Sequence, residues 1–287
     1  MLFRSADADD YPQLIEKGFV KYYFENGLPR RFGLTDPEDI KQRWAKAMKA
    51  FYKKGQYSAR CNSALNNIYG VPVWSVSGVE FPCDSLFKAI RGMKEFSIDL
   101  RRSPEYVREA IKMIDDYFYP PFIKAIDNIK DSDTFAFASR GTSLVHTVLN
   151  PKQFEELQYP YIRRFAEDCK KRDLTCSIFM EGNILYDFFR DIPEGCVSLL
   201  YEYGDPVEMK KALPNLTITG GLDSYYVGRA DVQECLDEAK RLVDEVGYDG
   251  HYIFTTDKML SFPGDAKREN FIALNEFLKS YAVFKEE

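Results

Sequence analysis

Several common sequence features are missing from this chain. No apolar run approaches the ~18 consecutive residues that a membrane-spanning helix needs, and the Asp-rich residues 7–10 do not resemble part of a secretory signal. The six cysteines include no Cys-x-x-Cys pair, which argues against a disulfide framework and against a cysteine-rich metal site. We therefore expect a cytoplasmic protein with free thiols.

The chain also has no excess of positive charge and few histidines. Lys and Arg number 39 against 45 Asp and Glu, which gives a net charge of −6, whereas nucleic-acid binding needs clustered basic residues that neutralise phosphates. His146 and His251 are the only histidines, and no Gly-x-Ser-x-Gly, Gly-x-Gly-x-x-Gly or P-loop pattern occurs. We expect no nucleic-acid partner and no membrane partner, and we find no motif of a serine hydrolase or of a nucleotide-binding enzyme.

Apolar residues are plentiful, and their pattern predicts alternating strands and helices. Hydrophobic residues make up 45% of the 287 residues, which is enough for a sizeable core and for one α/β barrel of roughly 250 residues. Amphipathic spacing and cap-plus-proline pairs predict helices at 9–26, 36–54, 151–171, 184–190, 206–212, 231–246 and 266–281. Short apolar runs predict strands at 71–77, 134–138, 174–180, 196–201, 216–219 and 252–255.

This alternation predicts a parallel sheet that helices cover on both faces. A closed (β/α)8 TIM barrel has eight strands, but only six runs qualify here, and the first 55 residues are predicted to be two helices. We therefore expect a TIM-barrel fold that lacks its first two βα units. Because no linker or charge block marks a boundary, we expect one domain over 1–287, with a helical segment at 1–70 and the βα units at 71–287.

Three predicted strands are followed by an acidic residue. Glu181, Glu202 and Asp223 stand 21 residues apart, which is about one βα unit each, and residues just past the carboxyl ends of barrel strands line the catalytic mouth. Three converging carboxylates repel each other unless they share protons or bind a cation. The spacing therefore favours a metal ion or a cationic substrate group at the mouth. The alternative is that such acids only cap the next helix, as Asp205 is expected to do.

Two further polar residues are candidates for substrate contact. Arg140 and His146 lie in the predicted loop 139–147 after the second strand, on the side of the mouth. Arg140 is a candidate anion anchor, and His146 either contacts substrate or makes a hydrogen bond within the loop. His251 opens the last predicted strand and is expected to be structural.

Several segments together resemble the uroporphyrinogen decarboxylase superfamily, whose members are (β/α)8 barrels. The resemblance covers roughly residue 70 to the end. Its segments are 82–86, 90–92, 98–105, 149–154, 159–160, 181–183, 218–223 and 268–271. The chain is most similar to the branch of cobalamin-dependent methyltransferases, whose methylthiol-forming members carry a zinc-binding His-x-Cys-Gly strand end. Here those positions hold Phe179, Met180, Glu181 and Gly182, so the sequence resembles instead the methyl-ether and methylamine type with acidic metal ligands.

The resemblance implies a zinc-dependent enzyme. Its acid-rich metal set falls on Asp187, Glu202 and Asp223, beside Glu181, and the resemblance implies about one zinc ion per chain. Glu181 and Glu202 would be catalytic, and Arg140, His146 and Tyr203 would bind substrate. Zinc would polarise the leaving group of a small methylated donor, and the methyl group would pass to a corrinoid on a separate partner protein.

Two alternatives remain at this point. A decarboxylase of the uroporphyrinogen type would need several arginines at the mouth, where the sequence offers Arg140 and Arg229. A non-catalytic, truncated barrel would expose a sheet edge, which allows a homodimer.

Overall fold

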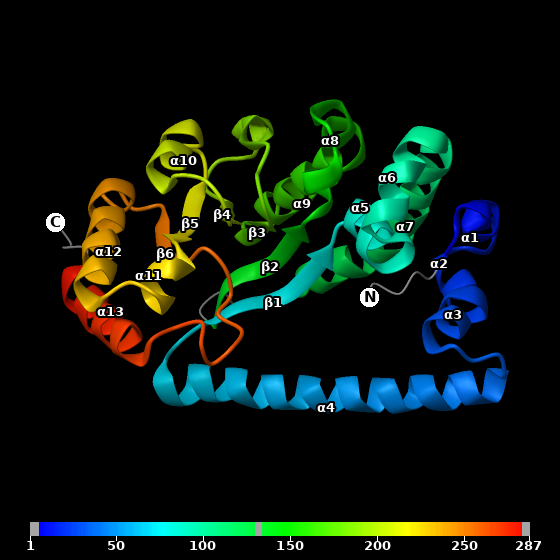
Figure 1. The fold of residues 1–287 in the computed structure, drawn as a ribbon, viewed down its shortest axis with the longest axis horizontal. Coiled ribbons are helices and arrows are strands. Elements are labelled where there is room, and N and C mark those ends of the chain that lie inside the picture. Colours follow the sequence, from blue (N-terminus) through cyan, green and yellow to red (C-terminus); the bar gives the residue numbers. More distant parts are fainter. Residues whose placement is uncertain (1–5, 130–133, 283–287) are drawn as a thin grey trace. The chain divides into compact units, whose positions relative to one another are not determined.

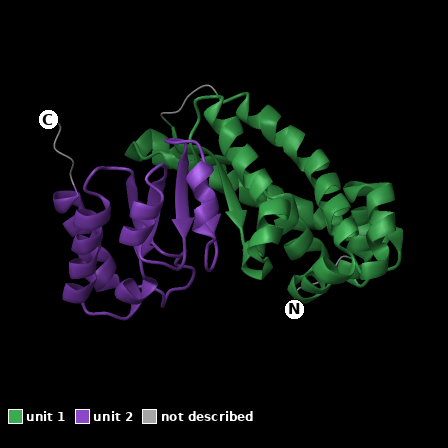
Figure 2. Cartoon of the chain, turned by 90° about the horizontal axis from the view of Figure 1, so that it is seen from above, with its two compact units in different colours: residues 1–176 green, residues 177–287 purple. Residues whose placement is uncertain are grey.

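The computed structural model describes residues 6–129 and 134–282. Strands and helices alternate along most of the chain (Figure 1). The contacts divide the chain into two compact units, Met1–Cys176 and Ser177–Glu287 (Figure 2). No helix in the described ranges is long and apolar enough to cross a bilayer, and all six cysteines are free thiols, as expected.

All six predicted strands are confirmed. They are β1 (Val73–Glu80), β2 (Phe135–Ser143), β3 (Cys176–Met180), β4 (Val197–Tyr201), β5 (Thr217–Leu222) and β6 (Tyr252–Thr256). Within the described residues they form a six-stranded sheet in chain order, β1-β2-β3-β4-β5-β6. The pairs β1/β2, β4/β5 and β5/β6 are parallel. The chain is therefore an α/β protein with a parallel sheet of the TIM-barrel kind, with six strands where a closed barrel has eight.

The first unit contains most of the helices. They are α1 (Tyr11–Lys17), α2 (Phe19–Tyr22), α3 (Leu28–Phe32), α4 (Pro37–Tyr69), α5 (Pro82–Ser85), α6 (Met93–Arg102), α7 (Pro104–Ile126), α8 (Pro151–Leu157) and α9 (Tyr159–Lys170). Two predicted helix starts are explained by their caps, because Asp36 and Asn150 accept hydrogen bonds from backbone N–H groups of the first turn. A proline follows each cap and fixes the backbone angle of the first turn.

Helix boundaries differ from the predictions in three places. The helix predicted at 9–26 is broken at Gly18, whose positive φ of 75° is incompatible with a continuous helix. The helix predicted at 36–54 continues through Gly55 to Tyr69 and ends at Gly70, which has a φ of 64°. The helix predicted at 151–171 is split, because Pro160 lacks the N–H that a continuous helix needs.

The second unit places its helices after β3–β6. A 3-10 helix spans Tyr186–Asp191, followed by α10 (Pro206–Ala212), α11 (Ser224–Gly228), α12 (Val232–Val246) and α13 (Arg268–Tyr281). Its fully buried residues include Ile178, Leu199 and Ile218 from the strands. Gly220 and Gly221 belong to β5 itself rather than to a turn after it. A Cβ atom at Gly221 would lie 2.6 Å from Cγ of Pro206, so this glycine lets α10 approach the strand.

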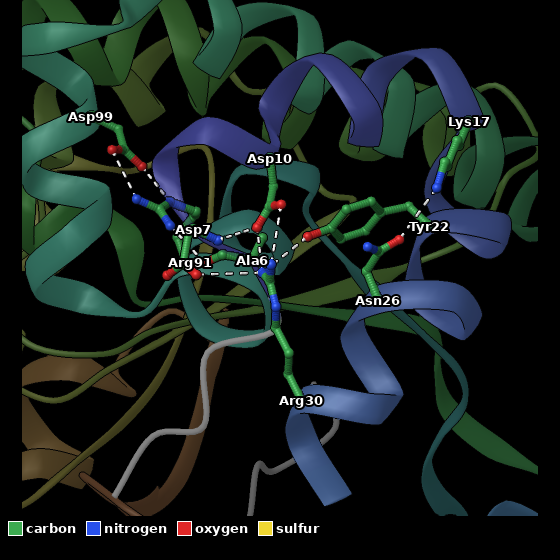
Figure 3. Close-up of polar contacts among 9 residues, drawn as sticks. All are labelled: Ala6, Asp7, Asp10, Lys17, Tyr22, Asn26, Arg30, Arg91 and Asp99. Carbon is green, nitrogen blue, oxygen red and sulfur yellow. Dashed lines mark hydrogen bonds and ion pairs between the residues drawn. The ribbon is translucent and has the colours of Figure 1, made fainter. Parts of the chain in front are cut away.

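A buried ion pair anchors the segment that begins at Ala6 within the first unit (Figure 3). Nε of Arg91 donates to Oδ2 of Asp99 at 2.5 Å, and Nη2 donates to Oδ1 at 3.0 Å. Both residues are only 2% exposed. Nη1 of Arg91 donates to the backbone oxygen of Ala6 at 2.6 Å, and the Tyr11 hydroxyl donates to Asp99 at 2.9 Å. The pair therefore has nearly all its polar atoms satisfied, as a buried pair requires.

A second ion pair closes the same N-terminal segment. The guanidinium of Arg30 contacts both carboxylate oxygens of Asp10, with Nη2 to Oδ1 at 3.2 Å. The backbone N–H of Asp7 donates to the same carboxylate at 2.6 Å. Burial raises the pKa of Asp10, but Arg30 and the Asp7 N–H outweigh it, so the net direction is downward.

Removal of the Arg91 charge should destabilise the first unit strongly. Arg91→Met leaves the Asp99 carboxylate buried without a cation, and we expect a loss of about 3–5 kcal/mol in the free energy of unfolding, measured with urea. The double variant Arg91→Met/Asp99→Leu should recover most of this loss, because it removes both charges. The control Arg108→Met breaks only exposed pairs, with Glu105 and Glu156, and should barely move the midpoint. A similarly small effect of Arg91→Met would contradict the anchoring role.

Candidate functional site

Four acidic residues follow the strands of the second unit at their carboxyl ends. Glu181 comes directly after β3, Glu202 after β4, Asp223 after β5 and Asp257 after β6. The carboxyl ends of parallel strands meet at one edge of a sheet, where α/β proteins bind their ligands. Asp257 was missed by the sequence prediction, although it follows the predicted strand 252–255 as regularly as the other three acids follow theirs.

A lysine lies among these acids. Nζ of Lys258 is 3.6 Å from Oδ2 of Asp257 and 5.9 Å from the centre of the Tyr203 ring. The Asp257 carboxylate raises the pKa of Lys258, and Tyr203 and Glu202 add to this effect. The ammonium group therefore stays protonated at neutral pH and supplies the positive charge that converging carboxylates require.

Backbone hydrogen bonds hold this cluster in place. The N–H of Ser224 donates to Oδ1 of Asp257 at 3.0 Å, and the N–H of Gly182 donates to Oε2 of Glu202 at 2.7 Å. Burial raises the pKa of Asp257, while Lys258 and the Ser224 N–H act in the opposite direction. The cluster is thus fixed by main-chain groups that follow two strands, β3 and β5.

Two hollows open beside Lys258 and Tyr203. One has a cavity volume of about 510 Å³ and is lined by Lys258, Asp223, Arg229 and aromatic residues of the loop after β6 and of α11. The other has a volume of about 540 Å³ and lies at the ends of β3 and β4, with Tyr203 on its wall. Both volumes suit a small organic ligand. Tyr203, predicted to bind substrate, is exposed and lies at this place.

The predicted zinc ligands are not assembled into a metal site. Asp187 lies on the 3-10 helix, is 73% exposed in its side chain, and pairs with Arg190 at 2.9 Å. Asp223 accepts a hydrogen bond from the N–H of Tyr225 at 2.8 Å and thus caps α11. Across residues 6–129 and 134–282, no three His, Cys, Asp or Glu side chains are grouped so that they could hold a metal ion. The described residues therefore do not fit the zinc centre that the resemblance implies.

Arg140 and His146 belong to the first unit, where the predicted loop 139–147 is partly wrong. Strand β2 continues to Ser143, so Arg140 lies within the strand, paired in register with Gly78 of β1. Gly141 makes room for Phe81, whose Cζ would be 2.6 Å from a Cβ atom there. His146 is only 3% exposed and lies on a 3-10 helix after β2.

His146 lies next to a buried polar network centred on Asp84. The N–H groups of Leu144 and Val145 donate to Oδ1 of Asp84 at 2.8 and 3.0 Å, and Nε2 of Gln158 donates to Oδ2 at 2.7 Å. Nδ1 of His146 is 3.2 Å from the Ser143 hydroxyl, which in turn accepts from Gln158. This network fixes the chain after β2. Of the two roles expected for His146, substrate contact or a local hydrogen bond, the structure shows the local hydrogen bond.

Comparison with known protein families assigns the chain. The family model of uroporphyrinogen decarboxylase (URO-D) matches residues 85–281. The chain belongs to the uroporphyrinogen decarboxylase family. The matched segment begins within α5 and extends to the last residue of α13, so it contains the site of this URO-D chain around Lys258. The comparison with curated proteins finds no match to the sequence.

A solved structure shares the fold of this URO-D chain. It is a methyltransferase from Methanosarcina mazei, with a TM-score of 0.54 and 16% sequence identity. The similarity covers 75% of this chain and 62% of that protein. The chain thus spans less than two thirds of the methyltransferase that it resembles.

The Asp84 network predicts an unusual pH dependence of stability. Burial raises the pKa of Asp84 to about 6, against the opposing effects of Lys88 and of the Leu144 and Val145 N–H groups. Between pH 4 and 6 the folded state holds a proton that the unfolded state has lost, so this residue's contribution to stability falls as the pH rises. In Asp84→Asn this contribution is absent. We expect the difference in unfolding free energy between wild type and variant to change by about 2 kcal/mol between pH 4 and pH 7.

The measurement is denaturant unfolding of both proteins at the two pH values. The variant also loses or alters hydrogen bonds, but that cost is the same at both pH values and cancels in the comparison. A difference that does not depend on pH would contradict the raised pKa of Asp84.

Proposed function

We propose that this URO-D family member is an enzyme that transfers a methyl group from a small methylated donor to a corrinoid protein. The Lys258 cluster at the carboxyl ends of the strands, beside two hollows of suitable volume, carries the proposal. Support comes from the family and from the fold that the chain shares with a methyltransferase. A corrinoid supplies a nucleophilic cobalt that accepts the methyl group. Because the described residues do not fit a zinc site, the proposal contains no step that uses zinc.

Lys258 has the main catalytic role in this proposal. When the methyl group leaves, negative charge develops on the heteroatom to which it was bound. A protonated ammonium group that is already in place stabilises such charge more strongly than water does. Asp257 and the ring of Tyr203 hold Lys258 in position, so its side chain need not be reoriented in the transition state.

The ammonium group of Lys258 distinguishes the two expected classes of donor. A methyl ether can accept a hydrogen bond from Lys258 through its oxygen, whereas a methylammonium nitrogen has no lone pair with which to accept one. The exposed rings of Tyr203 and Tyr225 offer apolar surface for an aromatic ether. We therefore propose a methyl ether as the donor, with Glu202 and Asp223 as polar contacts at the rim.

A decarboxylase of the uroporphyrinogen type is the second candidate. Its polyanionic substrate would need several cations, and the hollow after β5 and β6 offers Lys258 and Arg229. Glu202, Asp223 and Asp257 at the same strand ends would repel the carboxylates of such a substrate. Release of carbon dioxide from a porphyrinogen would favour this candidate, and inactivity in both assays would favour a non-catalytic barrel.

The test is methyl transfer to cob(I)alamin from a panel of methyl ethers and methylamines. We expect turnover with an ether, and a loss of roughly 100-fold or more in kcat/KM for Lys258→Met, as when a charge-stabilising donor is removed. Lys258→Arg should retain part of the activity because it keeps the charge. Lys112→Met is a matched control, because Lys112 is exposed on α7, lies outside both hollows and pairs with Asp116. Full activity of Lys258→Met, with the control unchanged, would refute the role of Lys258.

A further inference from the structure

The buried network around Asp84 contains one side-chain amide that is only half used. Asp84 and Gln158 are fully buried. Nε2 of Gln158 donates both of its hydrogens, one to Oδ2 of Asp84 at 2.7 Å and one to the Ser143 hydroxyl at 2.9 Å. Among residues 6–129 and 134–282, Oε1 of the same amide has no hydrogen-bond donor. A buried acceptor without a donor costs free energy, so this oxygen calls for a physical reason.

The hydrogen bonds of this network run in one direction when Asp84 is ionised. The Ser143 oxygen accepts a hydrogen from Gln158, so the hydroxyl's own hydrogen is available for Nδ1 of His146, which lies 3.2 Å away. Ser143 is fully buried, and Nδ1 is the acceptor that the described residues offer to this hydrogen. A neutral imidazole that accepts at Nδ1 carries its hydrogen on Nε2. The ionised carboxylate therefore requires the Nε2–H tautomer of His146.

A proton on Asp84 is incompatible with this direction. Oδ1 of Asp84 already accepts from the N–H groups of Leu144 and Val145 at 2.8 and 3.0 Å, so the proton binds at Oδ2. There it meets Nε2 of Gln158, and two donors cannot bond to each other. A half-turn of the amide brings Oε1 to this place as an acceptor. In either orientation one end of the amide lacks a partner among the described residues, so the charge of Asp84 decides between them.

We propose that this network is a pH-sensitive switch, in which protonation of Asp84 flips the amide of Gln158 and moves the ring hydrogen of His146 from Nε2 to Nδ1. The flipped amide presents Oε1 to Ser143, whose hydroxyl then donates to it. The Ser143 oxygen is left as an acceptor, and its partner Nδ1 must carry a hydrogen. The imidazole keeps one hydrogen, which exchanges with water during local opening, so the net change is one proton on Asp84. The switch is independent of the proposed activity.

The groups around the network allow both states. The charged and titratable groups of the neighbouring elements are Glu80 of β1, Cys83 of α5, Lys88 of the π-helix Leu86–Arg91, His146, and Tyr159 of α9. Nζ of Lys88 lies 3.8 Å from Oδ1 of Asp84 and 2.5 Å from Oε1 of Glu80, so the two acids share its charge. Burial raises the pKa of Asp84 to about 6, despite Lys88, and raises that of the Cys83 thiol as well. Asp84 therefore gains its proton in mildly acidic solution, while the thiol stays neutral.

Nitrogen-15 NMR of the full chain, labelled at histidine, tests the switch because it shows which ring nitrogen carries hydrogen. His146 and His251 are the only histidines, and His251→Asn assigns their signals. At pH 7.5 we expect the Nε2–H tautomer of His146 in wild type and the Nδ1–H tautomer in Asp84→Asn. The amide NH2 of that variant donates to Gln158 as a protonated Asp84 would, because the two backbone N–H groups keep its oxygen. In wild type, Nδ1 should gain a hydrogen when the pH is lowered to 5.

Two further variants test the path between Asp84 and His146, with circular dichroism to confirm that each protein is folded. Gln158→Met removes the amide, and in this background Asp84→Asn should leave the His146 tautomer unchanged. Glu80→Gln removes a carboxylate outside the chain of hydrogen bonds and should also change nothing. An Nδ1–H tautomer in wild type at pH 7.5, or no hydrogen on Nδ1 at pH 5, would overturn the proposal. So would a folded Asp84→Asn with the wild-type tautomer, or a response to Asp84→Asn that persists without the amide.

Discussion

Carboxylates that end neighbouring parallel strands repel each other, and this constraint shapes the site. Glu202, Asp223 and Asp257 follow β4, β5 and β6, and the strand geometry brings their backbones to one edge. The ammonium group of Lys258 offsets the repulsion between these carboxylates, and backbone N–H groups donate hydrogen bonds to Asp257 and Glu202. The cation is therefore covalently part of the chain, and the acidic edge can exist without a bound ion.

The site in the structure differs from the zinc centre that the resemblance implied. A metal site needs donors whose lone pairs are directed at one point. Here Asp187 turns to Arg190 on a 3-10 helix, and Asp223 caps α11. The family assignment and the proposed methyl transfer do not depend on that metal set, because a fixed ammonium group can also stabilise a departing heteroatom. In this proposal Lys258 thus has two roles: it offsets the negative charge at the strand ends, and it stabilises the departing heteroatom.

The family match and helix α4 occupy different parts of the chain. The match begins at residue 85, whereas α4 ends at Tyr69. The site around Lys258 lies within the matched segment, so its position follows from the family fold. Helix α4 lies outside the matched segment.

The sequence predicted the regular elements better than the side-chain roles. Short apolar runs identified all six strands, and in β3, β4 and β5 the runs follow from burial on both faces, which leaves few polar positions. Arg140 was misplaced because the apolar run of β2 ends at Ala138, whereas the strand continues to Ser143 and Gly141 admits Phe81. That contact joins residues distant in sequence, and no local pattern reveals it. Lys258 was overlooked because the compensating cation was expected to be a metal ion or a substrate group rather than a side chain of the chain itself.

The most direct test of the central claim is the zinc content of the purified full chain after equilibrium dialysis against dilute zinc. If Lys258 supplies the positive charge at the strand ends, wild type should hold far less than one zinc per chain, and Glu202→Ala should hold no less than wild type. About one zinc per chain in wild type, lost in Glu202→Ala, would show that the acids bind a metal and would contradict the account.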